Sequence, residues 1–295
     1  MPLVQAVKNA KKTIDIVIFR FDRVELEKAL ETAVSRGVVV RALIAHTNRG
    51  GEKILRKLEL RLLDAGVTVA RTADDLPRYH GKMLIADDTL HVYGFNYTKL
   101  DIEKSRSFGI MTTEPRLVKE ASALFEADSV RQAYSPGHDE LVVSPETSRA
   151  ILSAFIKKAK KELLIYDAKI TDRLMLRLLA ERAKAGVEIR TFGKVGKGAT
   201  GIETRKLPDL RLHVRAMIRD GAAVFVGSQS LRKLELAGRR EVGVIVEDER
   251  IAKKMREVFE ADWAQTPESK AAAASAEKDK EKDKEKDKEK ATSGA

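Results

Sequence analysis

Two short segments of this 295-residue chain carry side chains suited to chemistry on a phosphate ester. His80, Lys82 and Asp87 are spaced His-x-Lys-x4-Asp, and the same spacing recurs from His213 with arginine in place of lysine. A neutral imidazole can attack phosphorus while a protonated imidazole gives a proton to the leaving oxygen. Neighbouring cations stabilise the charge that develops on the phosphoryl oxygens. The predicted catalytic residues are His80, Lys82, Asp87, His213, Arg215 and Asp220.

Each motif is followed by a polar turn. The turns carry Asn96 in the first case and Ser228 and Ser230 in the second. Amides and hydroxyls are neutral hydrogen-bond donors, so these three residues are predicted to bind the substrate phosphate. No carboxylates or imidazoles cluster at metal-ligand spacing and the chain has no cysteine, so the sequence predicts neither a metal nor a cofactor.

The motifs must be positioned by strands. Period two in residues 79–87 predicts a strand with His80 and Lys82 on one face and Met83 and Ile85 on the other. Around it, apolar runs rich in β-branched residues alternate with segments whose apolar residues have helical spacing. Strands are expected at residues 14–19, 38–44, 67–70, 90–93 and 108–111, and helices at residues 24–35, 54–63 and 116–128. This alternation predicts an α/β fold.

The second half of the chain repeats the order of the first. Residues 125–128, Phe-Glu-Ala-Asp, recur letter for letter at residues 259–262. The difference in residue number between matching segments decreases along the chain. This decrease indicates that the second half lacks the counterpart of the helix at residues 54–63. We expect two structurally similar halves, each a mixed β-sheet flanked by helices, related by a pseudo-twofold axis that brings the two motifs together. The expected division is residues 1–130 for the first half, 131–147 for a linker, 148–265 for the second half and 266–295 for a disordered charged Lys/Glu/Asp tail.

The paired motifs resemble the HKD motifs of the phospholipase D superfamily. Within it, the chain looks most similar to bacterial phospholipase D and cardiolipin-synthase-like proteins, over nearly all of residues 8–265. The resemblance implies a metal-independent phosphodiesterase or phosphatidyl transferase that works through a phosphohistidine intermediate. It implies that His80 is the nucleophile and His213 the general acid. Glu241 matches a family carboxylate that orients a histidine.

Three residues depart from the family pattern. Arg215 replaces a lysine, and a planar guanidinium is not equivalent to a compact ammonium. Gly94 stands where serine is expected, and Ser107 stands where the first half should carry the counterpart of Glu241. These departures leave open a catalytically weak protein that still binds phosphate.

The net charge of +11 predicts an anionic partner. Candidates are a phospholipid or other phosphodiester substrate, an anionic membrane contacted peripherally, or nucleic acid in a nuclease of the same superfamily. Aromatic residues make up only 5% of the chain, which favours lipid over single-stranded nucleic acid. Because one chain carries both motifs, a monomer suffices to form the site.

The expected location is cytoplasmic or peripheral to a membrane, since no apolar run reaches the roughly 20 residues of a membrane span. It would be secreted or periplasmic if a leader had been removed. The Gly-rich basic segment at residues 193–201 is interpreted either as a lip over the phosphate site or as a surface loop.

Overall fold

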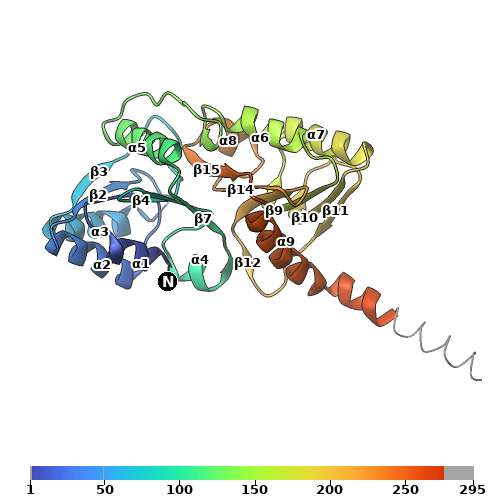
Figure 1. Cartoon of the computed structure of the whole chain (residues 1–295), viewed down its shortest axis with the longest axis horizontal. Helices are drawn as coiled ribbons and strands as arrows, with labels where there is room; N and C mark the ends of the chain where they lie inside the picture. Colours follow the sequence, from blue (N-terminus) through green and yellow to red (C-terminus); the bar gives the residue numbers. More distant parts are fainter. Residues whose placement is uncertain (1, 49, 276–295) are drawn as a thin grey trace, which may run out of the picture.

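The computed structural model describes residues 2–48 and 50–275 of the chain. Within them, two mixed sheets share one strand order and lie side by side (Figure 1). The first sheet has the order β3 (Thr68–Arg71), β2 (Val39–Ile44), β1 (Thr13–Ile18), β4 (Met83–Ala86), β5 (Thr89–Tyr93) and β7 (Gly109–Thr112). The second has the order β11 (Ile202–Arg205), β10 (Glu188–Val195), β9 (Glu162–Ile170), β13 (Arg215–Arg219), β14 (Ala223–Gly227), β15 (Glu241–Val246) and β8 (Leu141–Ser144).

The helices cover the outer faces of both sheets and fill the space between them (Figure 1). On the first sheet, the outer helices are α1 (Pro2–Asn9), α2 (Val24–Ser35) and α3 (Glu52–Asp64). On the second, they are α6 (Ser148–Lys157) and α7 (Arg173–Lys184). The inner helices are α5 (Pro115–Ser129) and α9 (Glu249–Ala264), and the short helices α4 (Lys99–Glu103) and α8 (Lys233–Ala237) precede β7 and β15. The predicted α/β fold with two similar halves is therefore confirmed.

The central strands are buried on both faces. β1 reads Thr-Ile-Asp-Ile-Val-Ile, and five of its six residues are buried, as expected for a strand covered by helices on one side and by the other half on the opposite side. One apolar core lies between the two sheets and includes Phe125 of α5 and Phe259 of α9. Separate cores lie under the outer helices of each half.

Reciprocal ion pairs join the halves. Arg240 of the second half pairs with Asp128 of the first at 3.0 Å, and Arg106 of the first pairs with Asp262 of the second at 2.5 Å. The two aspartates end the repeated Phe-Glu-Ala-Asp segments, which explains why that segment recurs. A two-stranded parallel pairing of β6 (Ser105–Arg106) with β12 (Arg211–Leu212) also connects the halves.

The structure departs from the predicted boundaries in two places. Residues 79–82 are not part of a sheet strand, because β4 begins only at Met83. These residues instead reach the other half, where the backbone N–H of His80 donates to the carbonyl of Arg240 at 2.7 Å. The expected linker, residues 131–147, contains β8, which pairs with β15 and so belongs to the second sheet.

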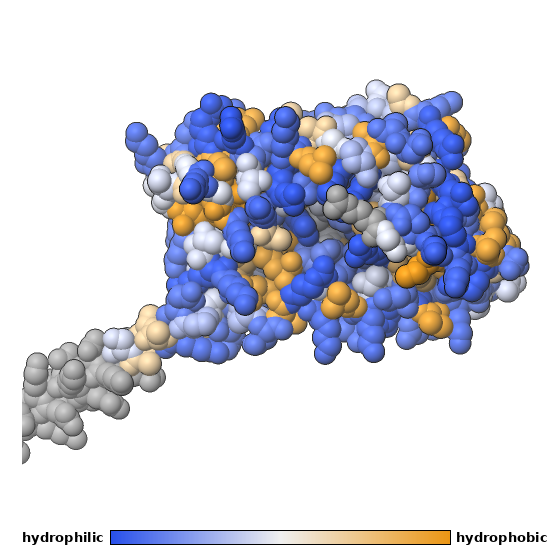
Figure 2. All heavy atoms as spheres, turned by 180° about the vertical axis from the view of Figure 1, so that it is seen from behind, coloured by the Kyte–Doolittle hydropathy of each residue, from blue (hydrophilic) through white to orange (hydrophobic). Residues whose placement is uncertain are grey.

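The predicted disordered tail lies mostly outside the described residues, apart from a helical stretch at residues 267–275. No helix in the described part of the chain is long and apolar enough to cross a membrane. The face in Figure 2 is mainly hydrophilic, with apolar side chains in small separate groups.

Candidate active site

His80 lies just before β4 and is held by a carboxylate from the other half. Its Nδ1 is 2.8 Å from Oε2 of Glu241, which is fully buried at the start of β15. The ring of Phe19 packs edge-on against the imidazole, with 4.5 Å between ring centroids. A carboxylate on Nδ1 fixes a proton there and leaves Nε2 with its lone pair.

His213 also faces a carboxylate of the other half, from a residue that the sequence analysis missed, but at a distance too long for a good hydrogen bond. Its Nδ1 is 3.4 Å from Oδ2 of Asp101, in α4 of the first half. Asp101 is 2% exposed and also accepts hydrogen bonds from Asn96 and Arg211. Each histidine thus takes its carboxylate from the opposite half.

The expectation that Ser107 leaves the first half without an orienting carboxylate is corrected by this contact. Ser107 does occupy the position that matches Glu241, but its hydroxyl donates to the backbone carbonyl of Asp101 at 2.8 Å. The position that matches Asp101 in the second half is Glu235, which pairs with Arg239 instead of a histidine. The carboxylate that faces a histidine therefore comes from a different position of the repeat in each half.

The cations beside the histidines occupy equivalent places. Lys82 is 1% exposed, and its Nζ donates to the carbonyl of His80 at 2.5 Å. Arg215 donates to the carbonyl of His213 in the same relation, two residues back along the chain. The change from lysine to arginine therefore preserves the local contact.

The surroundings of both imidazoles disfavour the protonated form when no anion is bound. Burial is the largest cause that lowers the pKa of His80 well below its usual value, followed by the charges of Lys82 and Arg215. Burial also lowers the pKa of His213, where Asp101 opposes it and Arg215 and Lys82 add to it. Because the same two cations act on both histidines, the motifs share one site. A phosphate anion placed there would favour the protonated form of each group.

The three predicted phosphate-binding residues are buried and bonded to protein. Asn96 donates to Asp101 at 2.6 Å. The Ser228 hydroxyl accepts a hydrogen bond from the backbone N–H of Val242. Burial raises the pKa of Glu241, and Ser228 lowers it by a smaller amount. Ser230 donates to Asp167, a buried carboxylate whose pKa burial raises. Asn96 therefore supports the carboxylate that faces His213, and Ser228 is bound to the strand that carries Glu241.

Asp87 and Asp220 lie away from the histidines. Asp87 accepts hydrogen bonds from the backbone N–H groups of Lys11, Lys12 and Thr13 at 2.8–2.9 Å, at the start of β1. Asp220 likewise accepts hydrogen bonds from the backbone N–H groups of residues 160–162, where β9 begins. Each has a positive φ, +50° and +54° respectively, which aspartate tolerates better than most residues. The structure does not bring this part of the predicted catalytic set to the site.

We expect Asp87→Ala to lower the free energy of unfolding by about 1–2 kcal/mol, because three backbone donors lose their acceptor. Burial acts to raise the pKa of Asp87, but the three amides outweigh it and the net pKa is lowered. The stabilisation is therefore present above the unfolded-state pKa, about 3.9, and is lost as pH falls through the lower folded-state pKa. Urea denaturation at pH 7 and at about pH 3 measures both effects.

The exposed neighbour Asp88 supplies the matched control, and Asp88→Ala should leave stability unchanged. A loss of activity per folded molecule in Asp87→Ala would contradict the structural role.

Two hollows lie near the histidines, because one wall includes Asp101, which faces His213, and the other includes Arg78 and Arg239, whose charges add to the effect of burial in lowering the pKa of His80. The first, of about 370 Å³, includes Arg20, Asn48, Asp101 and Arg211 in its wall. The second, of about 300 Å³, includes Arg78 and Arg239. The β2–α3 loop contributes to both walls, with Thr47 in one and Asn48 in the other. The sequence analysis singled out none of these arginines, and two of them are balanced by acids, since Arg211 pairs with Asp101 and Arg239 with Glu235.

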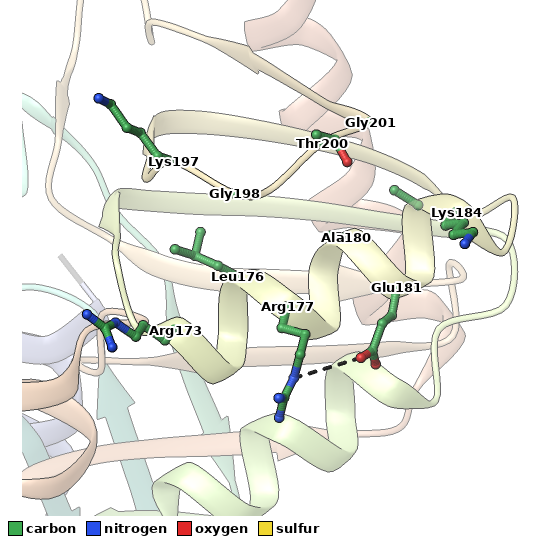
Figure 3. A pocket seen from close by; sticks show the side chains of 11 residues that line it. Arg173, Leu176, Arg177, Ala180, Glu181, Lys184, Lys197, Gly198, Thr200 and Gly201 are labelled. Atoms are coloured by element: carbon green, nitrogen blue, oxygen red, sulfur yellow. Dashed lines mark ion pairs between the residues drawn. The ribbon is translucent and has the colours of Figure 1, made fainter.

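A larger hollow, of about 580 Å³, lies beside α7 and includes residues 197–201 in its wall (Figure 3). It occupies the place left by the predicted loss of a helix, since residues 196–201 connect β10 to β11 where α3 connects β2 to β3. Lys197 and Lys184 stand at opposite ends, and Arg177 turns to Glu181 at 3.8 Å. Its cations do not converge on one point, and the basic segment lies on α7 instead of lining the hollows beside the histidines.

Among residues 2–48 and 50–275, no three His, Cys, Asp or Glu side chains are grouped so that they could hold a metal ion.

Comparison with known proteins identifies a family that fits the paired histidine motifs. The family model described as cardiolipin synthase, PLD-like domain, matches residues 3–129 and 192–263, which together exceed half of the chain. This chain belongs to that phospholipase-D-like family. Members of the superfamily are generally phosphodiesterases. The resemblance seen in the sequence is thus confirmed.

Individual relatives are more distant. The chain is 27% identical over 118 residues to the mitochondrial cardiolipin hydrolase of Danio rerio, a match that covers 40% of this chain and 51% of that protein. Among solved structures it is similar to polyphosphate kinase from Porphyromonas gingivalis, with TM-score 0.72 and 17% identity over 89% of this chain and 47% of that one. Phosphatidylserine synthase from Haemophilus influenzae gives TM-score 0.64 and 12% identity over 88% and 83%. These likenesses support the fold, and the chain spans about half the length of the first two relatives.

Proposed function

We propose that this protein is a phospholipase-D-type phosphodiesterase that transfers a phosphatidyl group through a phosphohistidine on His80. The observation that carries the proposal is the crossed arrangement in which Nδ1 of each histidine faces a buried carboxylate of the other half, at 2.8 Å for His80 and 3.4 Å for His213. Such a carboxylate fixes the tautomer and orientation of an imidazole that must exchange protons or attack through Nε2. A histidine serving only the packing of the core would not need it.

In the first step, Nε2 of neutral His80 attacks phosphorus. The bond from phosphorus to the leaving oxygen breaks, and protonated His213 gives its Nε2 proton to that oxygen. The phosphodiester anion of the substrate restores the protonated state of His213 that burial disfavours. Glu241 stabilises the positive charge that forms on His80 as it becomes a phosphohistidine.

In the second step, neutral His213 takes a proton from water or an alcohol. The resulting oxygen nucleophile attacks the phosphohistidine, the phosphorus–nitrogen bond breaks, and His80 is released. Water gives a phosphatidic acid and an alcohol gives a new phosphodiester. No oxidation occurs and both protons are accounted for.

Lys82 and Arg215 supply the positive charge for the phosphoryl oxygens. Lys82 is fully buried, and burial, its largest influence, lowers its pKa well below the usual value although Glu241 opposes this. An anionic phosphate would raise that pKa again, so the charge is strongest when substrate is present. Preorganised charge in a water-poor site contributes most where negative charge develops.

A phospholipid substrate is supported by the family match and by the cardiolipin hydrolase and phosphatidylserine synthase among the similar proteins. A nuclease that uses the same histidines is the second candidate, and the net charge of +11 favours it equally, because a phosphodiester backbone is also anionic.

The test is an assay with purified protein, a metal chelator and mixed phospholipid vesicles, with and without glycerol. Mass spectrometry of the lipids should find phosphatidic acid, and a glycerol-exchanged lipid when glycerol is present. The control is the same preparation with single-stranded and double-stranded DNA. Cleavage of DNA without any lipid product would replace the lipid proposal by the nuclease, and no product from either would leave a phosphate-binding protein.

A further inference from the structure

Three apolar side chains stand exposed at helix starts around the entrance of the site. Ile54 in the first turn of α3 is 62% exposed, Leu100 in α4 is 52% exposed, and Leu234 in α8 is 39% exposed. Ile54 and Leu100 belong to the wall of the first hollow beside the histidines, and Leu234 to that of the second.

The internal repeat places two of these groups in matching positions. Lys99-Leu100-Asp101 of the first half corresponds to Lys233-Leu234-Glu235 of the second. In both, the lysine and leucine are exposed while the acid is buried. The pseudo-twofold relation therefore sets a Lys-Leu pair on each side of the entrance.

Positive charge accompanies the aliphatic groups. Arg20 is exposed and belongs to the first hollow, and the exposed Lys99 and Lys233 directly precede Leu100 and Leu234. The acids at these positions are engaged within the protein, since Asp22 accepts from the backbone of Lys99 and Glu52 from that of Asn48, both at 2.7 Å. The entrance thus presents aliphatic and cationic groups together.

We propose that this docking rim, made of Ile54, Leu100 and Leu234 with the exposed cations Arg20, Lys99 and Lys233, seats the protein on an anionic phospholipid surface. The aliphatic side chains would enter the interface while the cations contact lipid phosphates, a combination that gives reversible interfacial binding. Docking here would point the histidines at the headgroup layer. The inference rests on the proposed function, because it takes the site to act on phospholipid. Its binding test does not require catalytic activity.

Other occupants fit the rim less well. A second copy of this chain would bring basic rims together in a protein of net charge +11. Single-stranded nucleic acid would gain little from aliphatic groups, because bases stack on aromatic rings. The aromatic residue in these walls, Phe21, is only 6% exposed.

The test compares the wild type with the triple variant Ile54→Ser, Leu100→Ser, Leu234→Ser. The matched control is Val24→Ser, Leu60→Ser, Met111→Ser, at residues 58%, 62% and 67% exposed that line neither hollow. Ile54 and Leu60 lie on the same helix with equal exposure, so the control also tests the effect of the substitution on α3. Binding is measured by sedimentation with vesicles of phosphatidylglycerol and phosphatidylcholine, and turnover with those vesicles and with dihexanoyl phosphatidylglycerol below its critical micelle concentration.

The rim variant should bind vesicles at least about tenfold more weakly and lose turnover on vesicles in proportion, with turnover on the dispersed lipid unchanged. The control variant should match the wild type throughout. Equal vesicle binding by wild type and rim variant, or an equal loss in the control, would overturn the docking rim. Rim-dependent binding without turnover on either lipid would support the rim and overturn the proposed function. Binding of single-stranded DNA that the rim variant loses, while its vesicle binding stays intact, would reassign the surface to nucleic acid.

Discussion

His80→Ala should reduce phosphodiester turnover by about 10⁴-fold or more, because the variant lacks the atom that forms the covalent intermediate. Rapid quenching of the wild type with a substrate labelled on the phosphatidyl group should trap label on the protein at His80. The label should be stable to base and labile to acid, as a phosphorus–nitrogen bond is. His80→Ala should carry none. The measurements are turnover, the amount of trapped label and peptide mapping of its position.

His138→Ala is the matched control, since His138 lies in the segment before β8, away from both motifs, and should keep full activity. Near-UV circular dichroism checks that His80→Ala is folded. If His80→Ala retained the label and His213→Ala lost it, the nucleophile and the acid would exchange roles. Turnover by His80→Ala within tenfold of the wild type would remove the covalent mechanism altogether.

His213→Ala should show a loss that depends on the leaving group. With a phospholipid, whose alcohol leaves poorly without a proton, the first step should slow by about 10³- to 10⁴-fold. With a p-nitrophenyl phosphodiester, whose leaving group needs little protonation, the variant should still release a burst of nitrophenolate. Label should then accumulate on His80, because the second step lacks its base. Stopped-flow absorbance measures the burst.

The pH dependence of the wild type follows from the same residue. The acid must be protonated, and that form is lost as pH rises through the pKa of His213, which burial lowers most and Asp101 partly restores. kcat/KM for lipid should therefore fall at a lower pH than an exposed histidine would give, while the nitrophenyl burst of His213→Ala should not show this limb. An equal loss on both substrates would exclude a general-acid role.

Asp101→Asn provides the positioning test for this pair. Removing the negative charge lowers the pKa of His213 further, so the falling limb should move to lower pH in addition to any drop in rate. Ser107→Ala, which keeps Asp101 and loses only a hydroxyl contact to its backbone, should leave the profile in place. A drop in rate without movement of the limb would give Asp101 a purely structural role.

Much of the fold could be predicted from the sequence because its signals are local. β-branched runs and helical spacing predicted the elements from β1 to α5 except α4 and β6, and the Phe-Glu-Ala-Asp repeat predicted the two halves. The start of β4 was placed too early, because alternation continues through His80 and Lys82 although their backbone has left the sheet. The strand β8 was missed because four apolar residues in a polar segment carry too weak a pattern.

The site was predictable only in its motifs. His80, His213 and their cations lie together as spacing and repetition suggested, and Glu241 holds a histidine as the family resemblance implied. Asp101 could not be found, because its partner His213 is 112 positions away and the matching acid of the repeat, Glu235, pairs with an arginine instead of a histidine. Asp87 and Asp220 match the motif but bind backbone amides, a role that sequence spacing does not separate from chemistry.

Because each histidine faces a carboxylate of the other half, the chain resembles a dimer whose two subunits have been fused. In a dimer of identical subunits, any substitution would appear at both histidines at once, so nucleophile and acid could not be adjusted separately. Here Glu241 serves one histidine and Asp101 the other, from positions of the repeat that do not correspond. In a fused chain the matching positions can carry different residues, as Lys82 and Arg215 do, and Glu241 and Ser107. Each substitution then affects only one of the two histidines.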